Sequence, residues 1–558
     1  MNINFLNKTS KYSVEELKQR RKERYLLILS GVLLGISFPP FPFPFPLLIF
    51  VSLIPYFYVI ENKEKLISIN RSSYLTFFVF SLITLYWVGS WQKESDPFLI
   101  ISGILLLFVN PFVLLISSTL FYYAKKIFKR RAVFLLFPFF WVTYEYLYTL
   151  TDLHFPWLTL GSGVAKFTTF IQVADIIGTF GISFIIVLIN VLFFLTFRYF
   201  QQNRKNSIIS LTGALLIFLV VLIYGLHKEN AYKQTGQSIK VGLIQPNLDP
   251  WAKWQFNDLD TLLNSYLNLS QKAVNKGAKI IIWPETALPV YLTMGEYAPE
   301  TEEIYNFIQK NNVYLLTGMP NIIFYNKNNH PEDSKYNESL GYYGTYNSIL
   351  LFSPYSQKIQ QYGKMKLVPF GERVPFVEAL PFLGKLIKWG VGITGWNIGR
   401  DTTIFKAVLK NKNQTVEDTV KIGGLVCFES VFPIFVSRFV DKGAQFLSVV
   451  TNDSWYGNSS GPYQHKEYAD LRAVENRRFV VRAANGGISC VINPLGQTIV
   501  ESKMFNRTYL VGSVTLSNEK TFFTKHPYII TDICVGISII MVLLFLYLKV
   551  KSKFRRSV

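Results

Sequence analysis

The stretch Lys421-Ile-Gly-Gly-Leu-Val-Cys427-Phe-Glu429-Ser430 decides the fold of the segment around it. Its apolar residues predict a buried strand of about five residues that runs directly into Cys427 and Glu429. Pro433 follows, and residues 434–440 have the apolar spacing of an amphipathic helix. A side chain at such a strand-to-helix turn is held rigidly with its tip outside the sheet, where a nucleophile belongs. A buried structural cysteine is the alternative, because most free cysteines are buried and inert.

The composition of the whole chain indicates a membrane protein. Of the 558 residues, 50% are hydrophobic, and the mean hydropathy is +0.24, which is high for a soluble protein of this size. Apolar runs long enough to cross a bilayer fill the segment 25–227 and recur near the carboxyl terminus. The sequence predicts eight spans, at residues 25–39, 46–61, 73–90, 97–124, 132–150, 170–197, 207–226 and 528–548.

Two of these spans have unusual features. The fourth and sixth are longer than one straight crossing needs, so we expect each to be tilted, kinked at Pro111 or Gly181, or partly interfacial. The first span follows a basic segment, as a signal peptide does, but no small-residue cleavage pattern comes after it. We therefore expect the first span to be retained.

The distribution of positive charge predicts the orientation in the membrane. With eight spans, the basic residues of segment 1–24, of three loops and of the tail 549–558 fall on one side, while the opposite loops hold only Lys93 and Lys166. Both termini are then cytoplasmic, and the globular segment 238–516 lies outside. The formal charge of +21 reflects this topology in good part. A nucleic-acid partner is not expected, since it would require a basic groove in one folded domain.

The globular segment 238–516 alternates predicted strands and helices. Residues 239–245 and 279–283 predict buried strands, with a helix from Asp258 between them, which implies a parallel pair with a right-handed crossover. Residues 321–342 are polar and predict an exposed loop, followed by a hairpin that turns at Pro354. After Cys427 a long helix from about Pro462 is predicted to carry His465, Arg472, Glu475, Arg478 and Arg482.

Three segments each bring one reactive side chain to a strand end or a shaped loop: Glu285, Lys364 and Cys427. A thiol is only slightly ionised near neutral pH, so a carboxylate must take its proton, and a fixed cation must receive the charge that develops on the attacked carbonyl. The trio therefore indicates acyl transfer. Taken alone, Lys364 and Glu372 could be an ordinary ion pair in a solvated turn.

The other two cysteines offer Cys427 no evident disulfide partner. Cys490 lies in an apolar strand pattern and Cys534 in the last predicted span. An unpaired thiol on the outer side of a membrane favours a functional role, because that compartment permits disulfides. The five histidines are scattered without metal-ligand spacing, so we expect neither a metal nor a cofactor, and we expect His465 to serve helix packing.

Motifs around the trio resemble a known superfamily. Trp-Pro-Glu285-Thr, Lys364-x-x-Leu-Val-Pro-Phe-Gly-Glu372 and Val-Cys427-Phe-Glu429-Ser resemble the nitrilase superfamily. The run Leu-Val-Pro-Phe-Gly-Glu-x-Val-Pro, the stretch Asn-Asp-Ser-Trp-Tyr-Gly and the eight-span frame are similar to the apolipoprotein N-acyltransferase family, over nearly the whole chain. The resemblance implies an αββα sandwich on a membrane base, in the bacterial cytoplasmic (inner) membrane, and we expect a monomer.

The resemblance also implies the reaction and the roles of three residues. A phospholipid of the bilayer donates an acyl chain to the α-amino group of the S-diacylglyceryl cysteine at the amino terminus of an apolipoprotein. Cys427 is then the nucleophile that forms a thioester, Glu285 the general base and Lys364 the oxyanion partner. Glu372 and Glu429 match supporting acidic positions of the family motifs.

Two tryptophans match aromatic positions of the family. Trp254, after Lys253, matches an aromatic lid near the entrance, and Trp157 matches an aromatic of an outer loop. An interfacial anchor is the alternative for both. The apolar segment Phe376 to Trp389 is expected to rest on the membrane or to cover the site.

The chain departs from the family pattern in two places. Family members commonly have Asn-Asn or Asn-Thr before a glycine where this chain has Asn485-Gly-Gly. Phe428 stands where a tyrosine is also seen, so a hydroxyl there is not essential.

Two other functions remain open. A membrane-anchored nitrilase-type amidase or hydrolase would use the same trio with water as acceptor. A transporter or scaffold should show internal repeats or charges within its spans, and little of either is evident.

Overall fold

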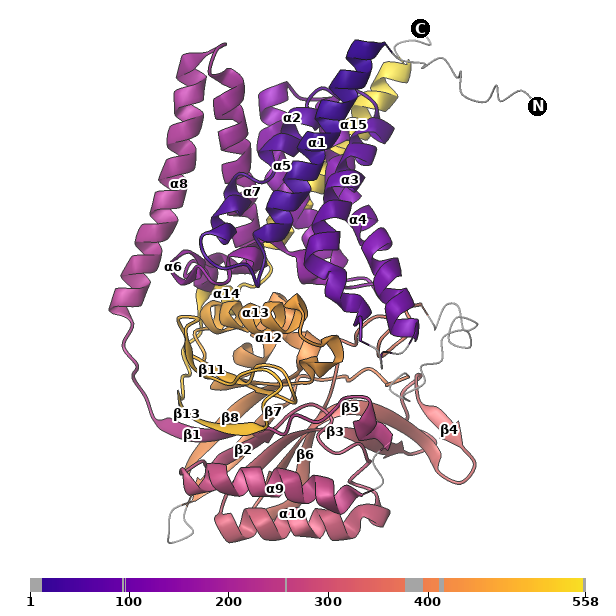
Figure 1. Cartoon of the computed structure of the whole chain (residues 1–558), viewed down its shortest axis with the longest axis vertical. Coiled ribbons are helices and arrows are strands. Elements are labelled where there is room, and N and C mark those ends of the chain that lie inside the picture. Colours follow the sequence, from indigo (N-terminus) through magenta and orange to yellow (C-terminus); the bar gives the residue numbers. More distant parts are fainter. Residues whose placement is uncertain are drawn as a thin grey trace, which may run out of the picture.

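The computed structural model describes residues 13–92, 95, 97–255, 258–376, 395–410 and 416–554. Figure 1 shows two parts stacked along the long axis, a helical part and an α/β part. The start of α1 and the end of α15 lie at the same end of the helical part, away from the α/β part (Figure 1). Apart from Phe376, the segment predicted to cover the site lies outside the described residues.

The helical part contains several helices that suit a membrane. Its helices are α1 (Val14–Ile36), α2 (Ile54–Ile60), α3 (Leu66–Leu85), α4 (Pro97–Lys125), α5 (Arg130–Tyr148), α6 (Thr168–Ile171), α7 (Ala174–Tyr199), α8 (Arg204–Ala231) and α15 (Ile529–Phe554). Among the described residues, five helical segments are long and apolar enough to cross a bilayer: Leu66–Gly89, Leu99–Lys125, Ala174–Tyr199, Arg204–Ala231 and Ile529–Phe554. The second predicted span is the 3₁₀ helix Phe45–Phe50 followed by the short α2, and eight crossings remain a prediction.

The kink in this part lies at a glycine other than the expected one. Helix α4 runs through Pro111 as one element. Helix α7 is broken at Gly178 (φ 64°, ψ −179°) rather than at Gly181, in a backbone region open essentially to glycine alone. A Cβ at Gly178 would lie 2.3 Å from the Phe523 ring. The break therefore lets α7 pass the short helix α14 (Phe522–Lys525).

The α/β part is a sandwich of two sheets. The first has the strand order β13-β1-β2-β3-β5-β4, with β6 beside β5, and the second has the order β12-β11-β10-β9-β8-β7. The strands of the first sheet are β1 (Ser238–Gln245), β2 (Ile280–Trp283), β3 (Tyr314–Tyr325), β4 (Lys335–Asn337), β5 (Gly341–Ser353), β6 (Ser356–Gly363) and β13 (Thr508–Thr515). Those of the second are β7 (Ile404–Lys410), β8 (Val416–Val426), β9 (Phe446–Thr451), β10 (Val480–Ala484), β11 (Cys490–Ile492) and β12 (Thr498–Glu501).

Helices cover both outer faces of the sandwich. Helices α9 (Leu259–Asn275) and α10 (Ala298–Asn311) cover the face farthest from the helical part, whereas α12 (Pro433–Asp441) and α13 (Ser460–Asn476) lie between the second sheet and the helical part (Figure 1). Strands β1 and β2 pair in parallel, as predicted. The predicted αββα architecture on a helical base is confirmed.

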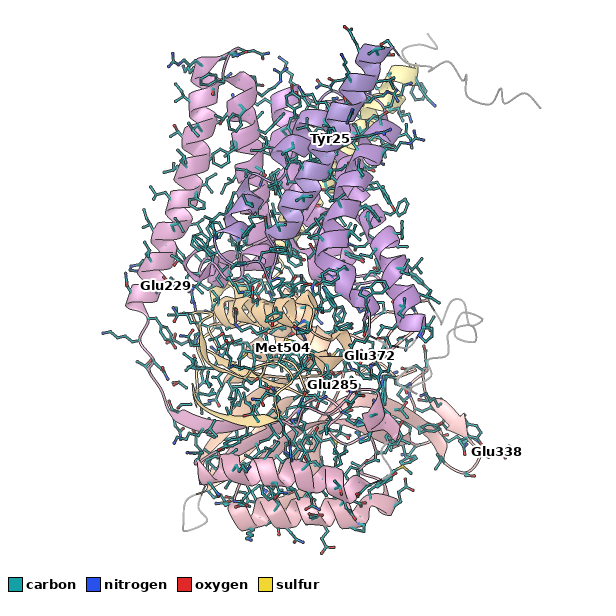
Figure 2. All side chains as sticks on the ribbon, in the orientation of Figure 1. Tyr25, Glu229, Glu285, Glu338, Glu372 and Met504 are labelled. Atoms are coloured by element: carbon teal, nitrogen blue, oxygen red, sulfur yellow. The ribbon has the colours of Figure 1, made fainter. Side chains whose placement is uncertain are left out.

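Two predicted boundaries in the α/β part are wrong. Part of the expected loop 321–342 is strand, because β3 pairs with β5 out to Tyr325 and Tyr342 and the short β4 pairs with the start of β5. Glu338 marks the tip of the β4–β5 hairpin, away from the body of the molecule (Figure 2), where both faces meet water and polar residues suit a strand. Helix α13 ends at Asn476, since Arg477 takes a left-handed φ of 48°. Arg482 therefore lies on β10 rather than on the helix.

Helix α13 joins the two parts. All but two of its 17 residues are buried, because one face packs on the sheet and the other on the helical part. The side chain of Gln464 accepts from Trp87 Nε1 at 3.0 Å and from Trp157 Nε1 at 2.7 Å, and it donates to the carbonyl of Pro39 at 2.8 Å. Polar groups buried between the parts are therefore paired across the junction, which fixes their relative position.

Gly178→Ala should destabilise the junction, because the new methyl group meets the Phe523 ring in a conformation that only glycine tolerates. We expect a loss of about 2 kcal/mol or more, measured as a lower melting temperature in detergent. Gly213→Ala in α8 is the matched control, since the nearest atom, Leu192 Cδ1, lies 3.7 Å from its Cβ position. An unchanged melting temperature for Gly178→Ala would contradict the assignment of the break.

Candidate active site

The ammonium group of Lys364 joins two carboxylates inside the protein. Its Nζ lies 2.8 Å from Glu372 Oε1 and 3.4 Å from Glu285 Oε1, and the side chain is 1% exposed. Asn347 Nδ2 donates to the same two oxygens, at 2.8 Å each. The ends of β2 and β6 and the loop after β6 are thereby held at one point, and Figure 2 shows Glu285 and Glu372 close together.

Glu285 also connects the two sheets. It follows β2 of the first sheet, and its Oε2 accepts from the backbone N–H of Asn452, which follows β9 of the second sheet, at 3.1 Å. Parallel strands deliver their carboxyl-terminal residues to one edge of a sheet, so facing sheets can bring two such edges together. The carboxylate is 6% exposed and is oriented by donors from both sides.

Cys427 lies at the end of β8 in a strained conformation. It starts the 3₁₀ helix Cys427–Val431 with a φ of 50°, which is uncommon for a residue other than glycine and typical of functional sites. Its carbonyl accepts from Ser430 Oγ at 2.8 Å and lies 3.0 Å from His465 Nε2. The hydroxyl of Thr451 donates to Sγ at 3.2 Å. The thiol is partly exposed, as a nucleophile must be.

The charges around the thiol set the protonation states. Desolvation raises the pKa of the Cys427 thiol well above its usual range; the charge of Glu285 raises it further, and that of Lys364 lowers it. Burial alone would lower the pKa of Lys364, but Glu372 and Glu285 outweigh burial and hold it above its usual value. Near neutral pH the lysine is therefore charged and the thiol protonated, so a nucleophilic role for this thiol would require a base.

Glu372 and Glu429 brace the loop that carries Lys364. Besides its contact with Lys364, Glu372 accepts from the backbone N–H of Val368 at 2.8 Å. Glu429 Oε1 accepts from Tyr362 Oη at 2.6 Å and from the N–H of Met365 at 2.7 Å. Glu429 thus joins the turn after Cys427 to the residues on both sides of Lys364, so the cation and the sulfur keep a fixed separation.

A buried network beneath the thiol was missed from the sequence. Asp453 lies 2.8 Å from His465 Nδ1 and 2.5 Å from Arg482, and its Oδ1 lies 3.0 Å from Thr451 Oγ1, whose single proton points to Sγ when Thr451 donates to Cys427. Although burial alone would raise it, Arg482 and His465 hold the pKa of Asp453 well below its usual range. The polar pair Asn452-Asp453, directly after an apolar strand, could have predicted this network, because Glu285 also follows a strand in this way. His465 is buried in α13, as a packing residue would be, but its Nε2 also lies 3.0 Å from the carbonyl oxygen of Cys427.

One group of possible metal ligands lies among the described residues, at this network. Atoms of Cys427, Asp453 and His465 lie within 4.8 Å of one another. The guanidinium of Arg482 already contacts Asp453, and a second cation there would meet its charge. The group is better suited to orient the cysteine turn than to bind a metal.

The two tryptophans have different surroundings. Trp157 is 5% exposed, and its ring is nearly parallel to that of Phe428, with centroids 6.3 Å apart, so it packs against the cysteine turn rather than in lipid. Trp254 is half-buried in the 3₁₀ helix Ala252–Gln255, and its role as a lid remains a prediction. Its neighbour Lys253 is buried and donates to Thr286 Oγ1 at 3.1 Å, and burial lowers its pKa to about 7.

Two charge variants should move the pH profile of thiol alkylation in opposite directions. Glu285→Gln removes a negative charge near Sγ, so it should lower the thiol pKa and speed alkylation by iodoacetamide at a given pH. Lys364→Met removes a positive charge and should do the reverse. The alkylation rate is measured against pH for both variants, and profiles that shift in the same direction would contradict the electrostatic assignment.

Thr451→Val should slow acylation of Cys427, because the thiolate loses its hydrogen-bond donor. We expect a fall of about tenfold, corresponding to one hydrogen bond to a charged group. Thr451→Ser keeps the hydroxyl and should keep most of the rate. The single-turnover acylation rate is compared for the two variants, and equal losses would show that shape rather than the hydrogen bond matters.

Comparison with known proteins gives matches to both parts of the chain. Residues 240–521 match the family model of carbon-nitrogen hydrolases, and residues 30–192 match that of the apolipoprotein N-acyltransferase N-terminal domain. Among solved structures, Saccharomyces cerevisiae Nit3, a member of branch 10 of the nitrilase superfamily, matches with a TM-score of 0.36 and 17% identity, over 51% of this chain and 93% of that one.

Curated relatives match over almost the whole length. The apolipoprotein N-acyltransferase of Chlorobaculum tepidum is 34% identical over 94% of this chain and 96% of its own. That of Geobacter metallireducens is 31% identical over the same shares. Because the identity is above 30% and both domains are covered, the chain belongs to the apolipoprotein N-acyltransferase family.

Proposed function

We propose that this bacterial membrane protein transfers an acyl chain from a phospholipid to the α-amino group of the S-diacylglyceryl cysteine of an apolipoprotein. The observation that carries the proposal is the convergence of Glu285, Lys364 and Cys427 at one point, beside a base of apolar helices. Family membership supports the same chemistry, since the relatives are named for this transfer.

In the first half of the reaction, Glu285 takes the proton of Cys427, and Sγ attacks the ester carbonyl of the phospholipid. The ammonium of Lys364 stabilises the oxyanion that forms. The carbon–oxygen bond then breaks, and the lysophospholipid hydroxyl leaves with the proton that Glu285 took. The acyl chain remains on the enzyme as a thioester of Cys427.

In the second half, the amino group of the lipoprotein attacks the thioester. Glu285 takes a proton from the attacking nitrogen, Lys364 again stabilises the oxyanion, and the carbon–sulfur bond breaks. The thiolate recovers a proton from Glu285, and the product carries an amide. Each half returns Glu285 to its starting state, so one base serves both.

The position of the site suits two substrates that remain in the membrane. Helix α13 packs between the second sheet and the helical part, and Trp157 of the helical part packs on Phe428, next to Cys427. The α/β part is joined to membrane helices at both ends, by α8 and by α15. In the proposed topology both termini are cytoplasmic, the site faces the outer leaflet and the protein acts as a monomer. Neither lipid then has to leave the bilayer to react.

A membrane-anchored hydrolase would use the same three residues with water as acceptor. The match of residues 30–192 to the N-terminal domain of the acyltransferases favours transfer. The two activities are separated by incubating the purified protein with phospholipid and a diacylglyceryl peptide. Release of free fatty acid without acylation of the peptide would reject the proposal.

Cys427→Ala should abolish the acyl-enzyme while leaving the fold intact. After incubation with phospholipid, the intact mass of the wild type should rise by one acyl chain and that of Cys427→Ala should not. Cys490→Ala and Cys534→Ala are matched controls that should still be acylated, because both cysteines are buried away from the trio. Peptide acylation by Cys427→Ala would remove this residue from the mechanism.

A further inference from the structure

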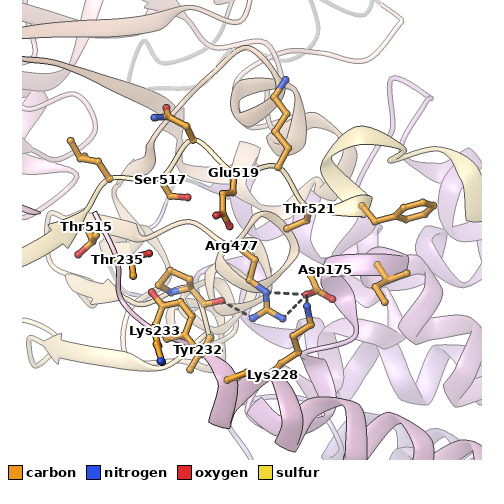
Figure 3. Close-up of a pocket in the computed structure, with 18 of the residues that line it drawn as sticks. Asp175, Lys228, Tyr232, Lys233, Thr235, Arg477, Thr515, Ser517, Glu519 and Thr521 are labelled. Carbon is orange, nitrogen blue, oxygen red and sulfur yellow. Dashed lines mark hydrogen bonds and ion pairs between the residues drawn. The ribbon is translucent and has the colours of Figure 1, made fainter. Parts of the chain in front are cut away.

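Two cavities at the junction of the two parts differ in how their positive charges are balanced. The larger, of about 920 Å³, lies between the ends of α7 and α8 and residues 515–522. In it Arg477 bonds to Asp175 at 2.8 Å (Figure 3), and Lys228 Nζ lies 3.3 Å from the same carboxylate oxygen. A built-in anion is therefore already shared by these two cations.

The smaller cavity, of about 170 Å³, contains cations without such a partner. Lys366 and Arg438 line it, and neither makes an ion pair with any residue in the described part of the chain. Lys366 Nζ lies over the Phe432 ring, 5.3 Å from its centroid. Arg438 donates to Tyr528 Oη at 2.8 Å. Both cations thus contact only neutral groups of the cavity.

The proximity of the two cations is unfavourable in the free protein. Lys366 is half-buried; burial and then the charge of Arg438 lower its pKa, and the smaller effect of Glu429 raises it. Two positive charges that repel each other in a partly desolvated place are stabilised when an anion binds between them. The arrangement is that of an anion site.

The opposite wall of the cavity is apolar and belongs to the helical part. Tyr146 of α5 and Phe180 of α7 line it, together with Leu150, which is 60% exposed at its edge. Cations on the α/β side and apolar groups on the helical side match the two ends of a lipid. The volume is below the about 300–1,000 Å³ of sites that enclose a whole ligand, so it fits a headgroup whose chains extend outside.

The cavity lies next to the reaction centre. Lys366 is two residues after Lys364 in the same loop, so at most ~7 Å separates their Cα atoms. Phe432 ends the turn that begins at Cys427, and its ring lies 5.1 Å from that of Phe428. A lipid whose headgroup is held here would lie at the side of the cysteine turn that faces the membrane.

We propose that Lys366 and Arg438 bind the phosphate of a membrane phospholipid in this cavity and so hold the acyl donor beside Cys427. The proposal rests on the proposed function, which makes a phospholipid the donor. The shared chemistry is a phosphate group, which free phosphate could also supply. Lys366 and Arg438 are positioning residues, since they hold the headgroup and do not take part in the acyl transfer.

Binding can be measured without chemistry by using a lipid that cannot be cleaved. The probe is a fluorescent diether phosphatidylglycerol, and its partner is the same diether lipid without phosphate, both titrated against the full-length protein in detergent micelles. Lys366→Gln and Arg438→Gln should each weaken binding of the phosphate lipid about 5-fold, and the double variant more than about 10-fold. Binding of the phosphate-free lipid should not change.

Lys228→Gln and Lys233→Gln, in the larger cavity, are matched controls that should bind both lipids as the wild type does. Wild-type affinity in the double variant, or an equal loss for both lipids, would overturn the proposal. Displacement of the lipid by millimolar inorganic phosphate would assign the site to free phosphate and reject the lipid. Failure of peptide acylation with this binding pattern intact would instead reject the proposed function alone.

Discussion

The contact of one buried ammonium group with two carboxylates holds the centre of this protein together. Lys364 and Glu372 come from one loop and Glu285 from the end of a distant strand, and each would be costly to bury without the others. Desolvation and the charge of Glu285 raise the pKa of the Cys427 thiol beside them, and the charge of Lys364 lowers it. The same contact therefore fixes the positions of the three groups to which we assign the base, the oxyanion partner and the support of the loop.

That Glu285, Lys364 and Cys427 lie together was predictable, because each ends a short sequence motif; their roles in the reaction remain a proposal. Glu285 and Cys427 follow apolar strands, and Lys364 lies in a loop shaped by proline and glycine. Asn347 and Thr451 were not predictable in this way, since each lies within a strand and acts only because the two sheets bring distant residues to it. The sequence pattern reports what one segment does, whereas these roles depend on how segments meet.

The errors in the predicted elements have the same origin. The predicted helix extended through Arg478 and Arg482, but α13 ends at Asn476; the structure buries both arginines, and Arg482 pairs with Asp453. The break at Gly178 rather than Gly181 depends on the approach of Phe523 from a segment more than 300 positions away. No local pattern distinguishes the two glycines. The polar hairpin tip was read as a loop because pairing, rather than burial, keeps it extended.

Helix α13 has a consequence for the evolution of the chain. A domain whose outer helix has one solvent-exposed face can be lost or exchanged as a unit. Nearly every residue of α13 is buried, however, on one side by the sheet and on the other by the helical part. Expressed alone, the α/β half would expose Gln464 and the aromatic surface of Phe428 and Tyr468, which Trp157 of the helical part covers. The two halves are thus inseparable, and the residues that meet across α13 must change together.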